Sequence, residues 1–306
     1  MAELCATSFR AMGCQVHLWL ETDEDGAPLL TAAAARIAEL EAALSRFRPE
    51  SELSRLNAQV GSWFAASRDL LANVQAAKQG ARLTNGLYNP LVMDALERAG
   101  YDRSYELLDE NTPSRAPIPA SNWPDIEIDL PNQRLRLPAR IDLGGVAKGW
   151  TAEVIADELA AHGPCLVDMG GDLVARGAPQ GRDGWPVAVA DPAANGDPLL
   201  TLSVTDCAVV TSGTDYRRWG PGRTAHHLID PRTGQPAHTD VATVTIIHPQ
   251  AATAEVYAKA VILEGSDAGL NWLNDQWDGA GLVVRQDGAV LATTRFERMV
   301  YEGVLP

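Results

Sequence analysis

Apolar and polar positions alternate near the start of the chain. Between residues 8 and 21, Val16, Leu18 and Leu20 are separated by Gln15, His17 and Trp19. Successive side chains of a strand point to opposite faces, so this alternation is typical of a half-buried strand. We therefore expect a strand over 8–21 with the three aliphatic residues facing a core.

The pattern then changes to helical spacing. Apolar residues recur at intervals of three and four from Leu30 to Phe47, and Pro49 follows, which predicts a helix over 30–46. Other elements are predicted in the same way from periodicity and turn residues. They are helices over 66–83, 146–161, 251–264 and 266–275, strands beginning at 165, 185, 199 and 241, and hairpins over 126–138 and around Asp287-Gly288.

Helices and strands follow one another without a strict βαβ order. The stretch 101–124 is rich in proline and polar residues, and we interpret it as a surface excursion. No internal repeat and no clear domain boundary is visible. The sequence therefore predicts an α+β fold, with one or more mixed sheets packed with helices, in a single domain over 1–306.

Composition narrows the class of partner. The chain has 306 residues, 46% of them hydrophobic, and a formal net charge of −15, which disfavours nucleic acid as a ligand. The four cysteines are widely separated, so we expect neither a zinc site nor a disulfide framework. No apolar run is long enough to span a membrane. The first residues lack a basic start followed by an apolar run, so we expect a cytoplasmic protein without membrane insertion. The expected oligomeric state is a monomer or homodimer.

The segment IDLGGVAKGW, residues 141–150, carries the strongest local signal. Gly144 and Gly145 stand between a short apolar stretch and a predicted helix, where the backbone can approach a ligand closely. A helix N-terminus favours anions, and Lys148 lies in its first turn. These features indicate a site for a nucleotide pyrophosphate. The alternative is an ordinary tight turn in which Asp142 caps the helix.

Two further turns follow apolar runs. They are MGGDL at 169–173 and TSG at 211–213. Together with the first segment they would suit a site along one edge of a sheet. Taken singly, each is equally compatible with an ordinary turn.

His226 and His227 stand side by side in AHHLIDPRTGQP, residues 225–236. In a strand, neighbouring side chains point to opposite faces, so only one of the two can face a site. A neutral histidine is a suitable general base near pH 7. The alternative is a pair of surface histidines.

The segment AEVYAKAVIL, residues 254–263, is apolar on nearly every face, which predicts a helix buried all round. Glu255 and Lys259 interrupt it four residues apart. Buried charges must be paired or committed to a ligand. The two either face a site or bridge to each other.

Eight segments occur in the order seen in one known family, and together they resemble the FAD:protein FMN transferases, or ApbE-type flavin transferases. The resemblance runs from about residue 8 to residue 265. The segments are AMGC at 11, SELSRLN at 51, GLYNP at 86, IDLGGVAKGW at 141, VDMGGDL at 167, VVTSGTDY at 209, HHLIDPRTG at 226 and AEVYAKA at 254.

The resemblance implies an enzyme that cleaves the pyrophosphate of FAD, transfers FMN to a Thr or Ser hydroxyl of a target flavoprotein and releases AMP. It implies catalytic roles for His227, Lys148 and Asp142. FAD contacts are implied for Met12, Leu87, Tyr88, Asn89, Asp142, Lys148, His227 and Ile229.

The resemblance also implies a Mg²⁺ ion held by the backbone carbonyl of Gly145 and by an Asp and a Thr on the late helix. Those two positions are Glu255 and Lys259 here. An ammonium cannot coordinate Mg²⁺, so Lys259 departs from the pattern, as does Asn89, where Asp is usual. Either Lys259 supplies the missing charge, or the chain binds flavin without transferring it. Besides FMN transfer and flavin binding without transfer, a third hypothesis for the function is a FAD pyrophosphatase that gives FMN and AMP.

Overall fold

The chain divides into two compact units, each built from segments that are distant in the sequence. The computed structural model describes residues 2–193, 197–214 and 216–299, so residue 215 of the motif at 209–216 lies outside the description, as do the two ends of the expected 1–306 domain. The first unit comprises Met1–Ala38, Lys148–Gly213 and Thr239–Pro306, and the second comprises Glu39–Ala147 and Thr214–His238.

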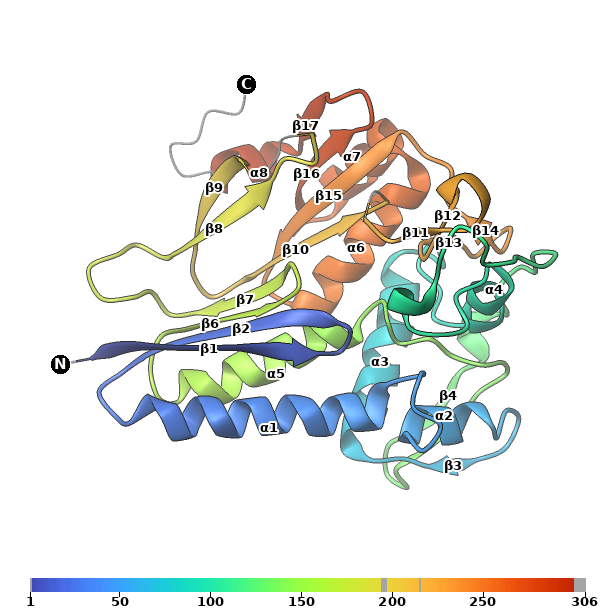
Figure 1. Ribbon diagram of the computed structural model, residues 1–306, viewed down its shortest axis with the longest axis horizontal. Coiled ribbons are helices and arrows are strands. Elements are labelled where there is room, and N and C mark those ends of the chain that lie inside the picture. Colours follow the sequence, from blue (N-terminus) through green and yellow to red (C-terminus); the bar gives the residue numbers. More distant parts are fainter. Residues whose placement is uncertain (1, 194–196, 215, 300–306) are drawn as a thin grey trace. The chain divides into compact units, whose positions relative to one another are not determined.

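An eight-stranded sheet forms the centre of the first unit (Figure 1). Each of its described pairings is antiparallel. In spatial order the strands are β1 (Glu3–Ala11), β2 (Cys14–Thr22), β6 (Cys165–Met169), β7 (Asp172–Arg176), β10 (Ala208–Gly213), β15 (Val241–His248), β16 (Ala280–Arg285) and β17 (Val290–Ala292).

Helices cover one face of this sheet, as Figure 1 shows for α1 (Gly26–Leu44) and α5 (Ala147–Ala160). A third helix, α6 (Ala251–Glu264), packs against β10 and β15. Val16, Leu18 and Leu20 belong to the hydrophobic cluster under the helices and are fully buried. The expected direction of these three side chains is confirmed.

The other face is covered by a two-stranded ribbon of β8 (Trp185–Ala190) and β9 (Pro198–Val204) together with α8 (Thr294–Met299). Trp185 and Phe296 are buried in the cluster on this side. Helix α7 (Ser266–Asp275) packs against α6 and β16. The first unit is thus a sheet buried on both faces.

The second unit is built from short elements around a smaller core. Ala99, Tyr101, Trp219 and Ile229 are among the buried residues of that core. Its elements are α2 (Glu52–Asn57), β3 (Phe64–Ala65), α3 (Arg68–Leu83), α4 (Met93–Arg98), η1 (Tyr105–Leu107), η2 (Trp123–Asp125), β4 (Glu127–Asp129), β5 (Arg134–Arg136), β11 (Arg218–Trp219), η3 (Pro221–Arg223), β12 (Ala225–His226), β13 (Ile229–Asp230) and β14 (Gln235–Pro236).

Most predicted elements are confirmed, and the helices over 251–264 and 266–275 have the expected bounds. The single strand over 8–21 is wrong, because a two-residue turn at Met12-Gly13 divides it into β1 and β2. Met12 and Gly13 have φ of 50° and 70°, as a tight hairpin requires. Helix α1 ends at Leu44, so Phe47 lies beyond it and is 37% exposed.

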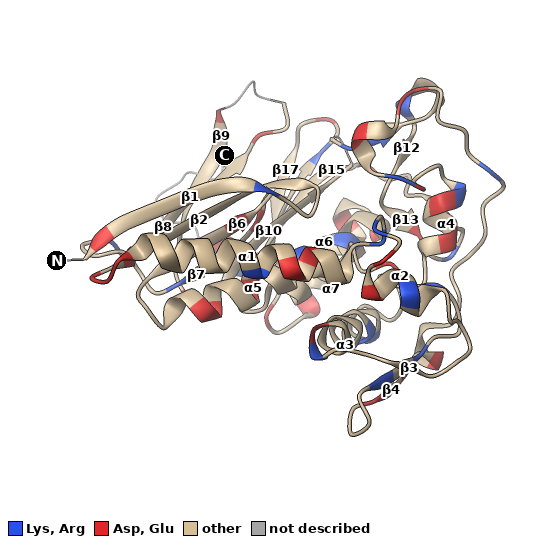
Figure 2. Ribbon diagram, turned by 60° about the horizontal axis from the view of Figure 1, so that its bottom comes forward, with Lys and Arg blue, Asp and Glu red and all other residues tan. Residues whose placement is uncertain are grey.

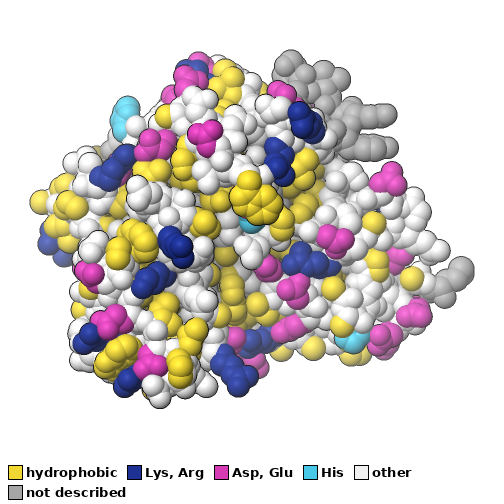
Figure 3. Space-filling view, turned by 180° about the vertical axis from the view of Figure 1, so that it is seen from behind, with side chains coloured by type: hydrophobic (Ala, Val, Ile, Leu, Met, Phe, Trp, Pro, Cys, Tyr) yellow, Lys and Arg dark blue, Asp and Glu magenta, His cyan; other side chains and the backbone are white. Residues whose placement is uncertain are grey.

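No helix within the described residues is both long enough and apolar enough to cross a membrane. Figure 2 shows acidic and basic residues interspersed along the helices, and Figure 3 shows both signs scattered among apolar side chains on one face. The face shown in Figure 3 therefore lacks the single-sign basic stripe that is typical of nucleic-acid binding.

Candidate functional site

The buried helix α6 carries two charges that bind each other. Glu255 is only 1% exposed. Its Oε2 accepts a hydrogen bond from Nζ of Lys259 at 3.2 Å, and the same ammonium donates to the backbone oxygen of Glu255 at 3.2 Å. The all-round burial of this helix is confirmed, and its two charges form the bridge that one of the two interpretations expected.

A glycine brings the first turn of α5 against this carboxylate. The N–H of Gly149 donates to Oε1 of Glu255 at 2.5 Å. A Cβ at position 149 would lie 2.8 Å from that oxygen and 3.1 Å from the carbonyl carbon of Ala251. Because real Cβ contacts are not this short, only glycine allows α5 to approach α6 so closely.

Lys148 forms an ion pair with Asp172, the first residue of β7. The Asp172 side chain is 2% exposed and that of Lys148 is 22% exposed. The turn before β7 brings Asp172 into place: Gly170 and Gly171 have φ of 68° and 95°, in the left-handed region that favours glycine. Lys148 therefore stands in the predicted first helical turn, next to a buried carboxylate.

The electrostatics of Glu255 follow from these neighbours. Burial by itself would raise the pKa of Glu255, but the ammonium groups of Lys259 and Lys148 and the N–H of Gly149 outweigh burial and hold the pKa below its usual value. The carboxylate is therefore ionised at neutral pH and compensated by two cations.

This arrangement does not fit Mg²⁺. Both oxygens of Glu255 already accept hydrogen bonds, and the Lys259 ammonium, which cannot be a ligand, lies against one of them. A divalent cation placed there would be repelled by that ammonium. Within residues 2–193, 197–214 and 216–299, no group of three or more His, Cys, Asp and Glu side chains is arranged to hold a metal ion. Gly145, the other expected ligand, belongs to the second unit.

Two of the expected turns lie side by side in the first unit. The N–H of Thr211 donates to the carbonyl of Gly171 at 3.1 Å, and its hydroxyl shares a hydrogen bond with Thr245 at 2.9 Å. Met12, at the tip of the β1–β2 hairpin, packs against the hydrophobic cluster under the helices. A non-glycine residue in the left-handed region is uncommon, and such residues are concentrated at functional sites.

In the second unit, Asp142 organises the turn that precedes α5. Its Oδ1 pairs with Nε of Arg46 at 2.9 Å, and its Oδ2 accepts from the N–H of Gly144 at 3.0 Å. The N–H of Gly144 is therefore engaged within the turn, and because α5 begins only at Ala147 this contact lies outside the helix. The backbone N–H of Asp142 donates to Pro90 at 2.8 Å, which ties this turn to the segment that follows Asn89.

Arg46 connects Asp142 to an aromatic group. Its guanidinium lies 4.2 Å from the ring centroid of Phe47 and 4.4 Å from that of Tyr101, and its Nη1 donates to the carbonyl of Tyr101 at 2.9 Å. Tyr101 packs on Trp219 with ring centroids 5.1 Å apart. Burial raises the pKa of Tyr101, so its hydroxyl is neutral.

Three of the expected flavin contacts come from residues 87–89. Leu87 is half-buried, while Tyr88 and Asn89 are buried. The amide of Asn89 is already used at both ends, because its Nδ2 donates to Ser121 at 3.0 Å and its Oδ1 accepts from the N–H of Leu91 at 2.9 Å. Asn89 therefore shapes the backbone of this segment.

The two neighbouring histidines differ in burial, and only His226 belongs to strand β12. His226 is buried, its Nε2 bonds the carbonyl of Ala237 at 2.9 Å, and its Nδ1 accepts from the N–H of Leu228 at 3.3 Å. Burial lowers its pKa, so it is neutral with the proton on Nε2. His226 is thus a structural residue, which leaves His227, half-buried, as the candidate base.

Ile229 lies in the hydrophobic core of the second unit together with Trp219 and Tyr101. Its side chain is 6% exposed. Its expected flavin contact remains a prediction.

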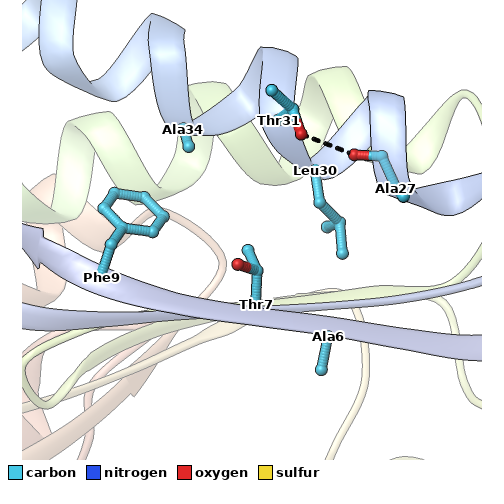
Figure 4. Close-up of a pocket in the computed structure, with 7 residues that line it drawn as sticks. All are labelled: Ala6, Thr7, Phe9, Ala27, Leu30, Thr31 and Ala34. Carbon is cyan, nitrogen blue, oxygen red and sulfur yellow. Dashed lines mark hydrogen bonds between the residues drawn. The ribbon is translucent and has the colours of Figure 1, made fainter.

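A groove of about 380 Å³ lies between β1 and α1 (Figure 4). The hydroxyl of Thr31 donates to the carbonyl of Ala27 at 2.8 Å, and no lining residue is charged. An anionic dinucleotide would find no cation there. The lining residues are Ala6, Thr7, Phe9, Ala27, Leu30, Thr31 and Ala34.

Comparison with known proteins decides the family. Residues 12–283 match the model of the ApbE family. The chain belongs to the ApbE family. It is 35% identical over 251 residues to the FAD:protein FMN transferase of Treponema pallidum, covering 74% of this chain and 68% of that protein. It is 29% identical over 258 residues to that of Vibrio cholerae, covering 80% and 76%.

Solved structures of ApbE proteins have the same fold. The ApbE protein of Thermotoga maritima superposes with a TM-score of 0.88 at 24% identity, covering 98% of this chain and all of that one. The flavin transferase ApbE of Vibrio cholerae gives a TM-score of 0.80 at 23% identity, with 98% of this chain covered. The expected α+β fold of the ApbE family is confirmed.

Sequence reasoning missed Arg46 and Tyr101. Arg46 lies just beyond the end of α1, and its partner Asp142 is almost a hundred residues further along the chain. A long-range pair of this kind leaves no trace in local periodicity. Asp172 was visible only as part of a glycine turn, although its burial makes it the partner of Lys148.

Proposed function

We propose that this protein is a FAD:protein FMN transferase, which transfers FMN from FAD to a Thr or Ser hydroxyl of a target flavoprotein and releases AMP. One observation carries the proposal: the family match spans residues 12–283, and relatives at 35% and 29% identity are FAD:protein FMN transferases. The chemistry at Lys148 supports it, because an ammonium in the first turn of a helix suits a diphosphate.

The reaction exchanges the phosphoanhydride bond of FAD for a phosphodiester bond to the acceptor. The acceptor oxygen attacks the phosphorus of the FMN half, the bond to the bridging oxygen breaks, and that oxygen leaves with AMP. The hydroxyl proton goes to His227, whose neighbour His226 is committed to the backbone. Lys148 counters the charge of the diphosphate, and Asp142 holds the glycine turn in shape.

Two other activities would use the same ligand. A flavin-binding protein would retain FAD unchanged, and a FAD pyrophosphatase would release FMN and AMP to water. The acceptor is proposed as a flavoprotein domain bearing a Thr or Ser, and location in the cytoplasm stays a prediction from the sequence.

The test is to incubate the protein with FAD and an acceptor domain that contains a D-x-x-(S/T)-G-A-T sequence. Intact-mass spectrometry of the acceptor should show one added FMN that survives acid denaturation. An acceptor with the Thr or Ser changed to Val or Ala should stay unmodified. His227→Gln should lower the rate by about a hundredfold or more, the usual size of a general-base contribution.

Each alternative gives its own result. FMN and AMP without an adduct would indicate a pyrophosphatase. Bound FAD that remains intact in the presence of acceptor would indicate a binding protein, and either result would overturn the transfer reaction.

A further inference from the structure

Lysine is scarce in this chain, and two of its three lysines lie in one cluster. Of the 25 basic residues, only Lys78, Lys148 and Lys259 are lysines. Lys148 pairs with Asp172, and Lys259 pairs with Glu255. Arginine supplies the positive charge almost everywhere else, so this cluster is where compact point charges are gathered.

The carboxylate between the two helices is fully committed to donors within the protein. Gly149 donates to one oxygen of Glu255, and Lys259 donates to the other. Glu255 is only 1% exposed, and its pairing with Lys259 within the same helix requires no ligand. The side chain that would have to bind a metal ion is therefore neutralised by the chain itself.

Lys259 retains a donor for a ligand. An ammonium has three N–H donors, and two of them go to the backbone oxygen and to Oε2 of Glu255. No acceptor takes the third within the part of the chain that the structure describes, and the Lys259 side chain is 14% exposed. The cation is thus fixed by two contacts to Glu255, while its side chain remains partly exposed.

We propose that the ammonium of Lys259 replaces a divalent metal ion in this protein, so that it binds the diphosphate of its ligand without Mg²⁺. The identity of that ligand as FAD rests on the proposed function, whereas the absence of a metal site rests on the contacts of Glu255 alone. Lys148, which pairs with the buried Asp172, is the second ammonium of the cluster and stands at the start of α5.

The first test measures metal directly and needs no flavin. Metal-stripped wild-type protein is titrated with Mn²⁺, which stands in for Mg²⁺, and free Mn²⁺ is followed by electron paramagnetic resonance. The wild type should show no saturable site. The double variant Glu255→Asp with Lys259→Thr should gain one, because the ammonium is replaced by a hydroxyl oxygen that can be a ligand. Lys78→Thr is the matched control, because it makes the same substitution at a lysine outside the cluster. Lys78 lies in α3 of the second unit and donates to the carbonyl of Ile126, so this variant should behave as wild type.

The second test measures FAD affinity by calorimetry in EDTA and in Mg²⁺. For the wild type the two dissociation constants should agree within twofold. For the double variant, EDTA should weaken binding at least tenfold relative to Mg²⁺.

The outcomes separate this inference from the proposed function. Saturable Mn²⁺ binding by the wild type, or FAD binding that requires Mg²⁺, would overturn the inference while leaving FMN transfer intact. Failure of FAD to bind under any condition would contradict the proposed function, and the Mn²⁺ titration of the wild type would still decide whether a metal site exists.

Discussion

Arg46 shows how much a single side chain contributes to the second unit. Its side chain is 7% exposed, it pairs with Asp142 at 2.9 Å, and its guanidinium packs between Phe47 and Tyr101. Asp142 in turn accepts the N–H of Gly144. A planar guanidinium can donate to a carboxylate and stack on two rings at once, which the ammonium of lysine cannot do.

Changing Arg46→Gln should lower the free energy of unfolding by about 3 kcal/mol, because the half-buried Asp142, whose side chain is 12% exposed, would be left without its cation. Arg46→Lys should recover only part of this loss. Urea unfolding followed by tryptophan fluorescence measures both. The control is Arg48→Gln, since the Arg48 side chain is 44% exposed and its pair with Glu41 is 3.3 Å long. That control should cost less than about 1 kcal/mol, as exposed pairs do. Equal losses at positions 46 and 48 would contradict the role given to Arg46.

At the scale of an element, helix α7 depends on a side chain from outside it. The residue before α7 is Gly265, which has no side chain to cap the helix. Asp240 takes that role: its Oδ1 accepts from the N–H of Ser266 at 3.0 Å and its Oδ2 from the hydroxyl of Ser266 at 2.5 Å. The hydrogen bonds from Ser266 hold the pKa of Asp240 below its usual value of 3.8.

Replacing Asp240→Ala should therefore destabilise the protein by about 1 kcal/mol at pH 7, the usual effect of losing a cap. Because the pKa is lowered in the folded state, this contribution is complete above pH 3.8 and is lost as the pH falls through the folded-state pKa. Urea unfolding of both proteins at pH 7, 5 and near 3 gives the difference. Asp183→Ala, at an exposed carboxylate, is the control. A difference that stays constant down to pH 3 would refute the capping role.

Helices and strands could be predicted from the sequence where the pattern of apolar and polar residues within the segment itself determines them. The helix over 251–264 was predicted because its segment 254–263 is apolar on nearly every face. The turn at Met12-Gly13 was missed because the prediction followed only Val16, Leu18 and Leu20: the inward-facing positions change from odd numbers in β1 to even numbers in β2, and this change of phase marks the hairpin. Strand β7 was missed because it starts immediately after two glycines and with a charged residue, Asp172. The ion pair of Asp172 with Lys148 joins residues far apart in the sequence, so only the folded structure reveals it.

At the scale of the whole molecule, the net charge is negative, whereas the few lysines are concentrated in one place. The net charge is −15, yet two of the three lysines lie on α5 and α6 within one cluster. Acidic residues are spread widely over the ribbon in Figure 2. A long-range field of this sign repels an anionic ligand, so local cations must provide the attraction.

Mapping the reactivity of all three lysines tests where an anionic ligand binds. Acetylation by N-hydroxysuccinimidyl acetate, measured by peptide mass spectrometry, should slow at Lys148 and Lys259 when FAD is present. Lys78 should be unaffected. Riboflavin lacks phosphate and should protect neither lysine of the cluster. Equal protection of all three lysines, or protection by riboflavin, would contradict a diphosphate site at Lys148 and Lys259.

The close approach of Gly149 to Glu255 restricts how this part of the chain can diverge. A methyl group at 149 would separate the two helices, and a neutral residue at 259 would leave the glutamate without its counter-charge. Substitutions at 255 and 259 are therefore expected to occur together in related chains, with glycine kept at 149. A relative that has exchanged the lysine for an oxygen ligand should also have regained its requirement for a metal ion.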